Sequence, residues 1–136
     1  MGASKYIHAN EIAIYKNEDR KKELLKEVRN KPIIFRVEKP TKLTRAKALG
    51  YHAKQGYIIV RVKVNKGDFR RPRPNHARRP SKSGIYYKLA VSKKDIAKNR
   101  AAKVYRNMNV LGAYFLIEDG KSKWFEVILL DKKKVV

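Results

Sequence analysis

Arginine, lysine and proline dominate one stretch of the sequence, FRRPRPNHARRPSKSGIYY at residues 69–87, which has no acidic residue. An arginine side chain pairs with phosphate through two parallel N–H donors and also stacks on bases, so arginine indicates nucleic acid more strongly than lysine does. The prolines stiffen the chain toward an extended conformation and lower the entropy cost of ordering it on a partner. The stretch predicts an arm that lies along a phosphate backbone; the alternative is a solvated, disordered loop.

Histidine and acidic residues give no comparable support for catalysis or metal binding. His8, His52 and His76 are scattered without the spacing of a metal site, and the chain has no cysteine. The sequence contains no nucleotide-binding glycine loop and no nucleophile elbow. Glu118 and Asp119 are adjacent beside Gly120 in a predicted turn, where Asp favours the turn geometry itself. We therefore expect no enzyme, no cofactor and no bound metal.

The whole chain is strongly basic. Its 136 residues include 35 Lys and Arg against 12 Asp and Glu, a formal net charge of +23. Self-repulsion of that size usually indicates a polyanionic partner. The hydrophobic fraction of 43% is nevertheless enough for a folded core. No apolar run approaches the roughly 20 residues that span a bilayer. The composition predicts one soluble, intracellular domain over residues 1–136 with no membrane partner. We also expect no small-molecule substrate.

Helices are expected to fill the N-terminal segment, residues 1–31. Residues 4–15 favour a short helix, and Asn17 can cap a second one that ends near Asn30. Residues 33–38 then alternate as a half-buried strand. In this strand the predicted inward residues are Ile33, Phe35 and Val37.

A second helix–strand pair follows. Thr41 is expected to cap a short helix that Gly50 terminates in a left-handed conformation. The next strand, which begins at Tyr57, has the clearest alternation in the chain. One face carries Ile58, Val60, Val62 and Val64, and the other carries Tyr57, Ile59, Arg61 and Lys63. The pattern places the two cations on an outward face.

The second half of the chain begins with residues 65–83, which lack apolar periodicity and predict a long basic loop. Ser92 and Asp95 form a capping box that opens a helix. Two strands joined by a turn at 118–122 follow, and their apolar residues on both faces place them in the middle of the sheet. The expected apolar face of the helix comprises Ala97, Ala101, Val104, Tyr105 and Met108. Residues 132–136 form a short basic tail.

These elements predict an α+β fold with three layers. Its sheet has four mainly antiparallel strands in the order β-α-β-α-β-β, preceded by the N-terminal helices and interrupted by the long basic loop. The cations are spread over strands, loops and helices and do not line one recognition helix, which favours folded RNA over DNA.

Residues 45–74, RAKALGYHAKQGYIIVRVKVNKGDFRRPRP, closely resemble the signature of the archaeal and eukaryotic large-subunit ribosomal protein family numbered fifteen with the suffix e. The opening MGASKYI and the hairpin at 109–131, NVLGAYFLIEDGKSKWFEVILLD, resemble the start and the closing hairpin of that family. Members usually continue past the hairpin with a long, basic, glycine-containing extension, whereas this chain ends at Val136. Residues 8–31 match weakly because they carry more acid than the family's usual segment.

The resemblance implies a structural protein of the large subunit of the cytoplasmic ribosome, with large-subunit rRNA and neighbouring ribosomal proteins as partners. The family's glycine–tyrosine motif falls on Gly50, Tyr51, Ala53, Lys54, Gln55, Gly56 and Tyr57, and its basic strand and arm fall on Arg61, Lys63, Arg70, Arg71, Pro72 and Pro74. Together with the charge pattern, it predicts RNA contacts at Tyr51, His52, Lys54, Gln55, Arg61, Lys63, Arg70, Arg71, Arg73, Arg78, Arg79 and Lys82. The alternative function is a free RNA-binding regulator or RNA chaperone outside the ribosome.

Overall fold

The computed structural model describes residues 2–68, 84 and 88–134. The elements are α1 (Ala3–Lys16), α2 (Glu18–Arg29), β1 (Ile34–Val37), α3 (Leu43–Ala48), β2 (Tyr57–Asn65), α4 (Lys93–Val104), β3 (Met108–Glu118), β4 (Ser122–Asp131) and a short 3-10 helix (Lys132–Lys134). This is the predicted α+β class, with the two N-terminal helices ahead of a β-α-β-α-β-β core.

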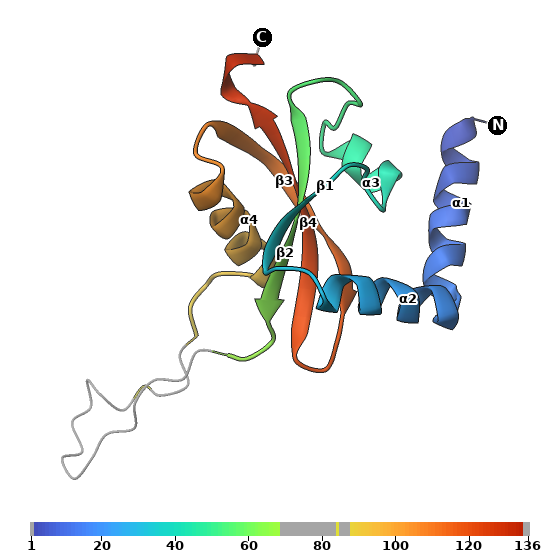
Figure 1. Cartoon of the computed structure of the whole chain (residues 1–136), viewed down its shortest axis with the longest axis horizontal. Coiled ribbons are helices and arrows are strands. Elements are labelled where there is room, and N and C mark those ends of the chain that lie inside the picture. Colours follow the sequence, from blue (N-terminus) through green and yellow to red (C-terminus); the bar gives the residue numbers. More distant parts are fainter. Residues whose placement is uncertain (1, 69–83, 85–87, 135–136) are drawn as a thin grey trace.

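The four strands form one antiparallel sheet in the order β1-β2-β4-β3 (Figure 1). The predicted hairpin of β3 and β4 is confirmed, but the prediction that both of its strands lie in the middle of the sheet is wrong for β3. β2 pairs with the far side of β4, which leaves β3 as an edge strand with Leu111 37% and Phe115 41% exposed. Apolar residues on both faces of a strand indicate layers above and below it, and they do not indicate how many strands lie beside it.

Helices cover both faces of the sheet, as the three-layer prediction requires (Figure 1). On one face, Ala97 and Ala101 of α4 pack on the valines of β2 and on Val127 of β4. These small residues let the helix lie close to the strands. On the other face, Val28 of α2 packs on Trp124, and Ala46 of α3 packs on Ile128. The sheet therefore has an apolar layer on each face, one beneath α4 and the other beneath α2 and α3.

Helix caps explain where α2 and α4 begin. The Asn17 side chain accepts from the backbone N–H groups of Asp19 (3.1 Å) and Arg20 (3.4 Å), and the Ser92 hydroxyl accepts from the N–H of Asp95 (3.1 Å). Both caps were predicted. The predicted cap at Thr41 is wrong, because Lys42 precedes α3 and Thr41 instead binds Glu126.

Two residues assigned to apolar faces are exposed in the structure. Ile33 precedes β1, and within β1 Ile34 packs toward α4 while Phe35 packs toward α2, so both faces of this strand are used. Val104 is exposed because α4 ends there, and Tyr105 and Met108 take the core positions in its place.

Gly50 lies just after α3 with φ of +89°, a backbone conformation that disfavours any residue with a Cβ atom. We expect Gly50→Ala to lower the free energy of unfolding by about 1–2 kcal/mol. Chemical denaturation would measure this loss. Gly120→Ala is the control, since a Cβ atom there meets nothing within 4 Å and no positive φ is required; an equal loss for both variants would contradict the backbone argument.

Candidate nucleic-acid interface

The predicted arm begins and ends at one place on the domain. Its cations Arg70, Arg71, Arg73, Arg78, Arg79 and Lys82 lie outside the described residues. The residues that flank the arm are described: Lys88 forms an ion pair with Asp68 (2.7 Å), and the Lys93 ammonium donates to the carbonyl of Gly67. The residues that follow β2, Gly67 and Asp68, therefore lie beside those that lead into α4, Lys88 and Lys93.

The turn between α3 and β2 presents an aromatic cluster with a cation. The ring of Tyr57 makes edge-on contacts with the rings of Tyr51 (6.0 Å between centroids) and His52 (5.6 Å). Tyr51 is half-buried, while His52, Lys54 and Gln55 are exposed. The structure thus brings together four of the predicted RNA contacts, Tyr51, His52, Lys54 and Gln55. Charged and aromatic groups in one exposed turn are able to meet both a phosphate and a base.

Three segments meet at this end of the sheet. The N–H of Asp131 donates to the carbonyl of Gly56 (2.9 Å), and the N–H of Lys132 donates to the carbonyl of Asn107 (3.3 Å). The turn before β2, the turn after α4 and the end of β4 are therefore joined through backbone hydrogen bonds. Their exposed cations, with one from the last turn of α4, are here called the basic end: Lys54, Lys103, Arg106, Lys132 and Lys133.

The cations of the basic end are electrostatically uncompensated. None of them lies within ion-pair distance of a carboxylate in the part of the chain that the structure describes. The Lys132 ammonium donates to the carbonyl of Arg106 (2.8 Å), which fixes two of the members relative to one another. Beside Arg106, a shallow hollow is lined by Asn99, Ala102 and Lys103. The arrangement suits an anionic ligand.

Sequence reasoning did not assign RNA contacts to Lys103, Arg106, Lys132 or Lys133. The helical pattern of α4 already placed Arg106 away from the apolar face, and the same wheel places Lys103 on the polar side as well. No local pattern indicates that residues 132 and 133 come to lie beside these two, because that proximity depends on pairing between β2, β3 and β4.

The prediction that Arg61 lies on an outward face is wrong. Arg61 is 5% exposed. Its guanidinium donates to Glu126 (3.0 Å), to Glu27 of α2 (2.8 Å) and to the hydroxyl of Thr41 (3.0 Å). The reason is that α2 and the segment before α3 cover this face of β2, so a polar side chain there needs buried partners. Arg61 joins three segments within the domain.

Glu126 is the centre of this buried network and is 0% exposed. Its carboxylate accepts from the hydroxyl and the N–H of Thr41, from Arg61 and from the hydroxyl of Tyr114. Burial, reinforced by the neighbouring Glu126 charge, raises the pKa of Tyr114 well above its ordinary value. Every oxygen of the carboxylate is satisfied, as a charge in a low-dielectric core requires.

Lys63 stays near the surface at the end of β2 where the arm begins. Its ammonium lies 5.5 Å from the centre of the Trp124 ring, and it lines a hollow together with Ile33, Asn65 and Arg100. Arg100 of α4 donates to the carbonyl of Lys63 (2.9 Å). Lys63 and Arg100 therefore place two cations near the end of β2 from which the chain continues toward the arm.

Tyr15 carries a buried hydroxyl that has no hydrogen-bond partner among the described residues. Burial raises the pKa of this phenol, and burial also lowers the pKa of Lys42, whose ammonium lies 4.1 Å from the centre of the Tyr15 ring. An unpaired buried hydroxyl costs about 1–3 kcal/mol.

Tyr15→Phe is therefore expected to raise the free energy of unfolding by about 1 kcal/mol, because it removes the unpaired hydroxyl and keeps the ring. A urea titration followed by tryptophan fluorescence measures the change. Tyr114→Phe is the matched control; it removes a hydroxyl that donates to a charged group and should cost about 1.5–3 kcal/mol. A loss of stability in both variants would show that the Tyr15 hydroxyl has a partner.

Positive charge is distributed unevenly along the chain. Residues 3–29 hold seven Lys or Arg and five Asp or Glu, so the remaining 28 cations are opposed by only seven acids. The helical segment α1–α2 is therefore nearly neutral, and the strongly basic surface belongs to the sheet, α4 and the arm.

A membrane span and a metal site have little support in the part of the chain that the structure describes. No described helix has the length and apolar character to cross a membrane. Within residues 2–68, 84 and 88–134, no group of three His, Asp or Glu side chains is placed to hold a metal ion.

The chain matches a known protein family over almost its whole length. The model of a family described as Ribosomal L15, the L15e type, matches residues 2–136. The match extends through α1 and α2, where the resemblance in sequence is weakest, as well as through the turn, the sheet and the arm.

Proposed function

Because the chain belongs to the L15e family, it is a protein of the large subunit of the cytoplasmic ribosome, and we propose that it stabilises large-subunit rRNA by neutralising phosphates of several RNA segments at once. The family is a structural class of ribonucleoprotein component. The proposal accordingly assigns RNA binding to the chain and no catalytic step.

The observation that carries the proposal is the basic end. Lys54, Lys103, Arg106, Lys132 and Lys133 are exposed and lack carboxylate partners in the described structure, and backbone hydrogen bonds between three segments hold their main chains together. Each cation that neutralises a phosphate releases counterions, and this release supplies favourable free energy at physiological salt. Phosphate contacts position a protein on RNA and carry little sequence information.

The arm supplies a second set of phosphate contacts in this proposal. The support comes from its composition and from the anchoring of its flanks, since Lys88 pairs with Asp68 and Lys93 donates to the carbonyl of Gly67. Arginine side chains on a proline-stiffened chain suit a narrow path between RNA helices. The arm and the basic end lie at opposite ends of β2, so together they reach two separate RNA segments.

The exposed turn before β2 adds contacts to unpaired bases. Tyr57 meets Tyr51 and His52 edge-on, and the exposed imidazole of His52 is free to stack on a base while Lys54 meets the adjoining phosphate. Base–aromatic stacking is worth about 1–3 kcal/mol per base.

Sedimentation of native lysate on sucrose gradients at low and high salt tests the proposal. We expect the tagged protein to co-migrate with the large subunit and to remain bound at moderately high salt, because a chain held by several RNA segments at once dissociates slowly even though each phosphate contact weakens as salt rises. A slowly sedimenting pool, or release at modest salt, would instead support the free regulator or RNA chaperone. An unrelated peripheral ribosome-binding protein serves as the control for salt stripping.

A further inference from the structure

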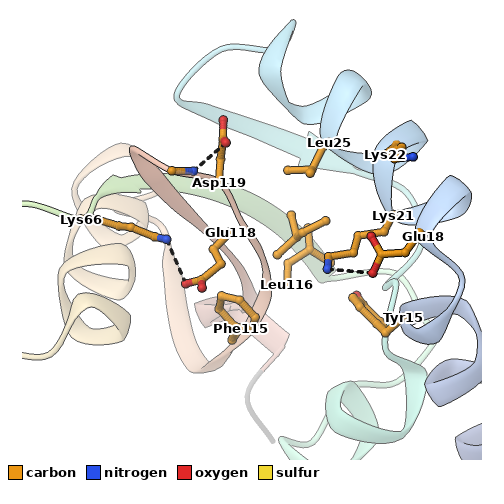
Figure 2. Close-up of a pocket in the computed structure, with 12 residues that line it drawn as sticks. Tyr15, Glu18, Lys21, Lys22, Leu25, Lys66, Phe115, Leu116, Glu118 and Asp119 are labelled. Carbon is orange, nitrogen blue, oxygen red and sulfur yellow. Dashed lines mark hydrogen bonds and ion pairs between the residues drawn. The ribbon is translucent and has the colours of Figure 1, made fainter.

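A groove separates the N-terminal helices from the β3–β4 hairpin (Figure 2). It has a volume of about 560 Å³. Tyr15 and Leu25 come from the helices, and Phe115 and Leu116 come from β3, the edge strand of the sheet (Figure 2). Leu116 is buried, whereas Phe115 is 41% exposed. The groove therefore has an apolar floor that is only partly covered.

The rim of the groove carries charges of both signs. Its members are Glu18, Lys21, Lys22, Lys66, Glu118 and Asp119. Lys21 pairs with Glu18 (3.4 Å) and Lys66 pairs with Glu118 (3.5 Å), and Figure 2 shows both contacts. A hydrogen bond from Lys123 lowers the pKa of Glu118, and the N–H of Gly120 lowers that of Asp119, so both carboxylates are charged at neutral pH. In a chain with only 12 acids, this is an unusual concentration of carboxylates.

We infer that this groove is a docking site for a polypeptide segment of a neighbouring protein in the large subunit, one that inserts an aliphatic or aromatic side chain between Leu25 and Phe115 and carries charges of both signs beside it. An apolar side chain would cover the exposed ring of Phe115, and mixed charges complement the balanced rim. The inference rests on membership of the large subunit and is independent of phosphate neutralisation.

RNA is the less favourable occupant of the groove. A phosphate backbone there would approach Glu18, Glu118 and Asp119, and like charges across an interface are repulsive. The basic end has the opposite character, since its cations have no described carboxylate partner.

At the centre of the groove, the partner makes contact through its side chains and does not pair as an additional strand with β3. The ammonium of Lys42 already donates to the carbonyl of Phe115 (3.0 Å), and its charge lies 5.6 Å from the centre of the Phe115 ring. Lys42, which precedes α3, thus occupies a carbonyl of the edge strand that an added strand would need, and its charge disfavours strand pairing there.

Site-specific photo-cross-linking in assembled subunits tests the inference. p-Benzoyl-L-phenylalanine replaces Lys22 on the rim of the groove, or Lys103 in the basic end, in the full chain expressed in cells. Large subunits are purified at high salt and irradiated, and adducts are identified by mass spectrometry for protein and by primer extension for rRNA. We expect a discrete ribosomal-protein adduct from position 22 and an rRNA adduct from position 103.

Substitutions identify the groove as the cause of the adduct. With the cross-linker at position 22, Phe115→Lys should reduce the protein adduct at least tenfold, relative to the amount of variant chain in the subunits. Leu111→Lys is the matched control, because Leu111 lies on the same strand with similar exposure but outside the groove, and it should leave the adduct unchanged. If Phe115→Lys is not incorporated into subunits, Phe115→Ser makes the same test with a smaller change.

The outcomes separate this inference from the proposed function. An rRNA adduct from position 22, no adduct there, or an adduct that does not respond to Phe115→Lys or to its serine substitute would overturn the docking site. A protein adduct from position 22 without an rRNA adduct from position 103 would support the docking site and count against RNA contact by the basic end.

Discussion

Replacing Glu126 by alanine is expected to lower the free energy of unfolding by about 3–5 kcal/mol, the usual cost of removing one partner of a buried ion pair. The substitution leaves Arg61 buried without its nearest carboxylate and deprives Thr41 and Tyr114 of their acceptor. The midpoint and slope of urea unfolding, followed by the fluorescence of Trp124, measure the loss. Such a loss is a large part of the stability of a small domain.

Glu27→Ala is the matched control for this prediction. It removes the other carboxylate that pairs with Arg61 (2.8 Å), but the Glu27 side chain is 50% exposed, so we expect a loss below about 1 kcal/mol. The double variant Arg61→Met with Glu126→Leu should recover part of the loss, because it removes both charges together, whereas Thr41 and Tyr114 still lack their acceptor. Similar losses for Glu27→Ala and Glu126→Ala would contradict the central role of Glu126.

Removing three cations of the basic end should weaken rRNA binding strongly without affecting the fold. The side chains of Lys103, Arg106 and Lys133 make no hydrogen bond or ion pair in the described structure. If each neutralises one phosphate, the triple alanine variant should lower the slope of log affinity against log salt by about 2–3 and the affinity at 0.1 M salt by about 100-fold or more. Filter binding to large-subunit rRNA over a range of salt concentrations measures both quantities.

The triple variant of Lys16, Arg20 and Lys26 is the control for net charge. These residues are exposed on α1 and α2, the nearly neutral part of the chain, and their replacement removes the same charge. We expect a much smaller change of slope. Equal changes for the two variants would indicate that net charge, and not the basic end, governs binding.

Much of the fold could be predicted because its causes are local. The side chains of Asn17 and Ser92 cap the helices that follow them, the alternation from Tyr57 defines β2, and Gly50 ends α3 with a positive φ. Each signal depends on residues a few positions apart, and the structure confirms each one. The failure at Thr41 is instructive, since its hydroxyl binds a carboxylate 85 positions away and does not cap the adjacent helix.

The candidate site could be predicted only in part. Lys54 and Gln55 are exposed, as a residue that contacts RNA must be, but Arg61 is not, although it follows the same strand pattern as Lys63. Alternation assigns a side chain to a face of a strand and does not reveal what covers that face. Near Arg61 the covering elements are α2 and the segment that contains Thr41.

By itself, the sequence determined the α+β class, the positions of the helices and strands, the strongly basic character and, through its motifs, the ribosomal family. Tertiary structure alone decided that Arg61 lies opposite Glu126 in the sheet register, that β3 is an edge strand, and that Arg106 and Lys132 lie side by side. The physical reason is the distance along the sequence over which each cause acts. Periodicity, caps and composition act within a few residues, whereas register, strand order and burial follow from which distant segments exclude water from one another.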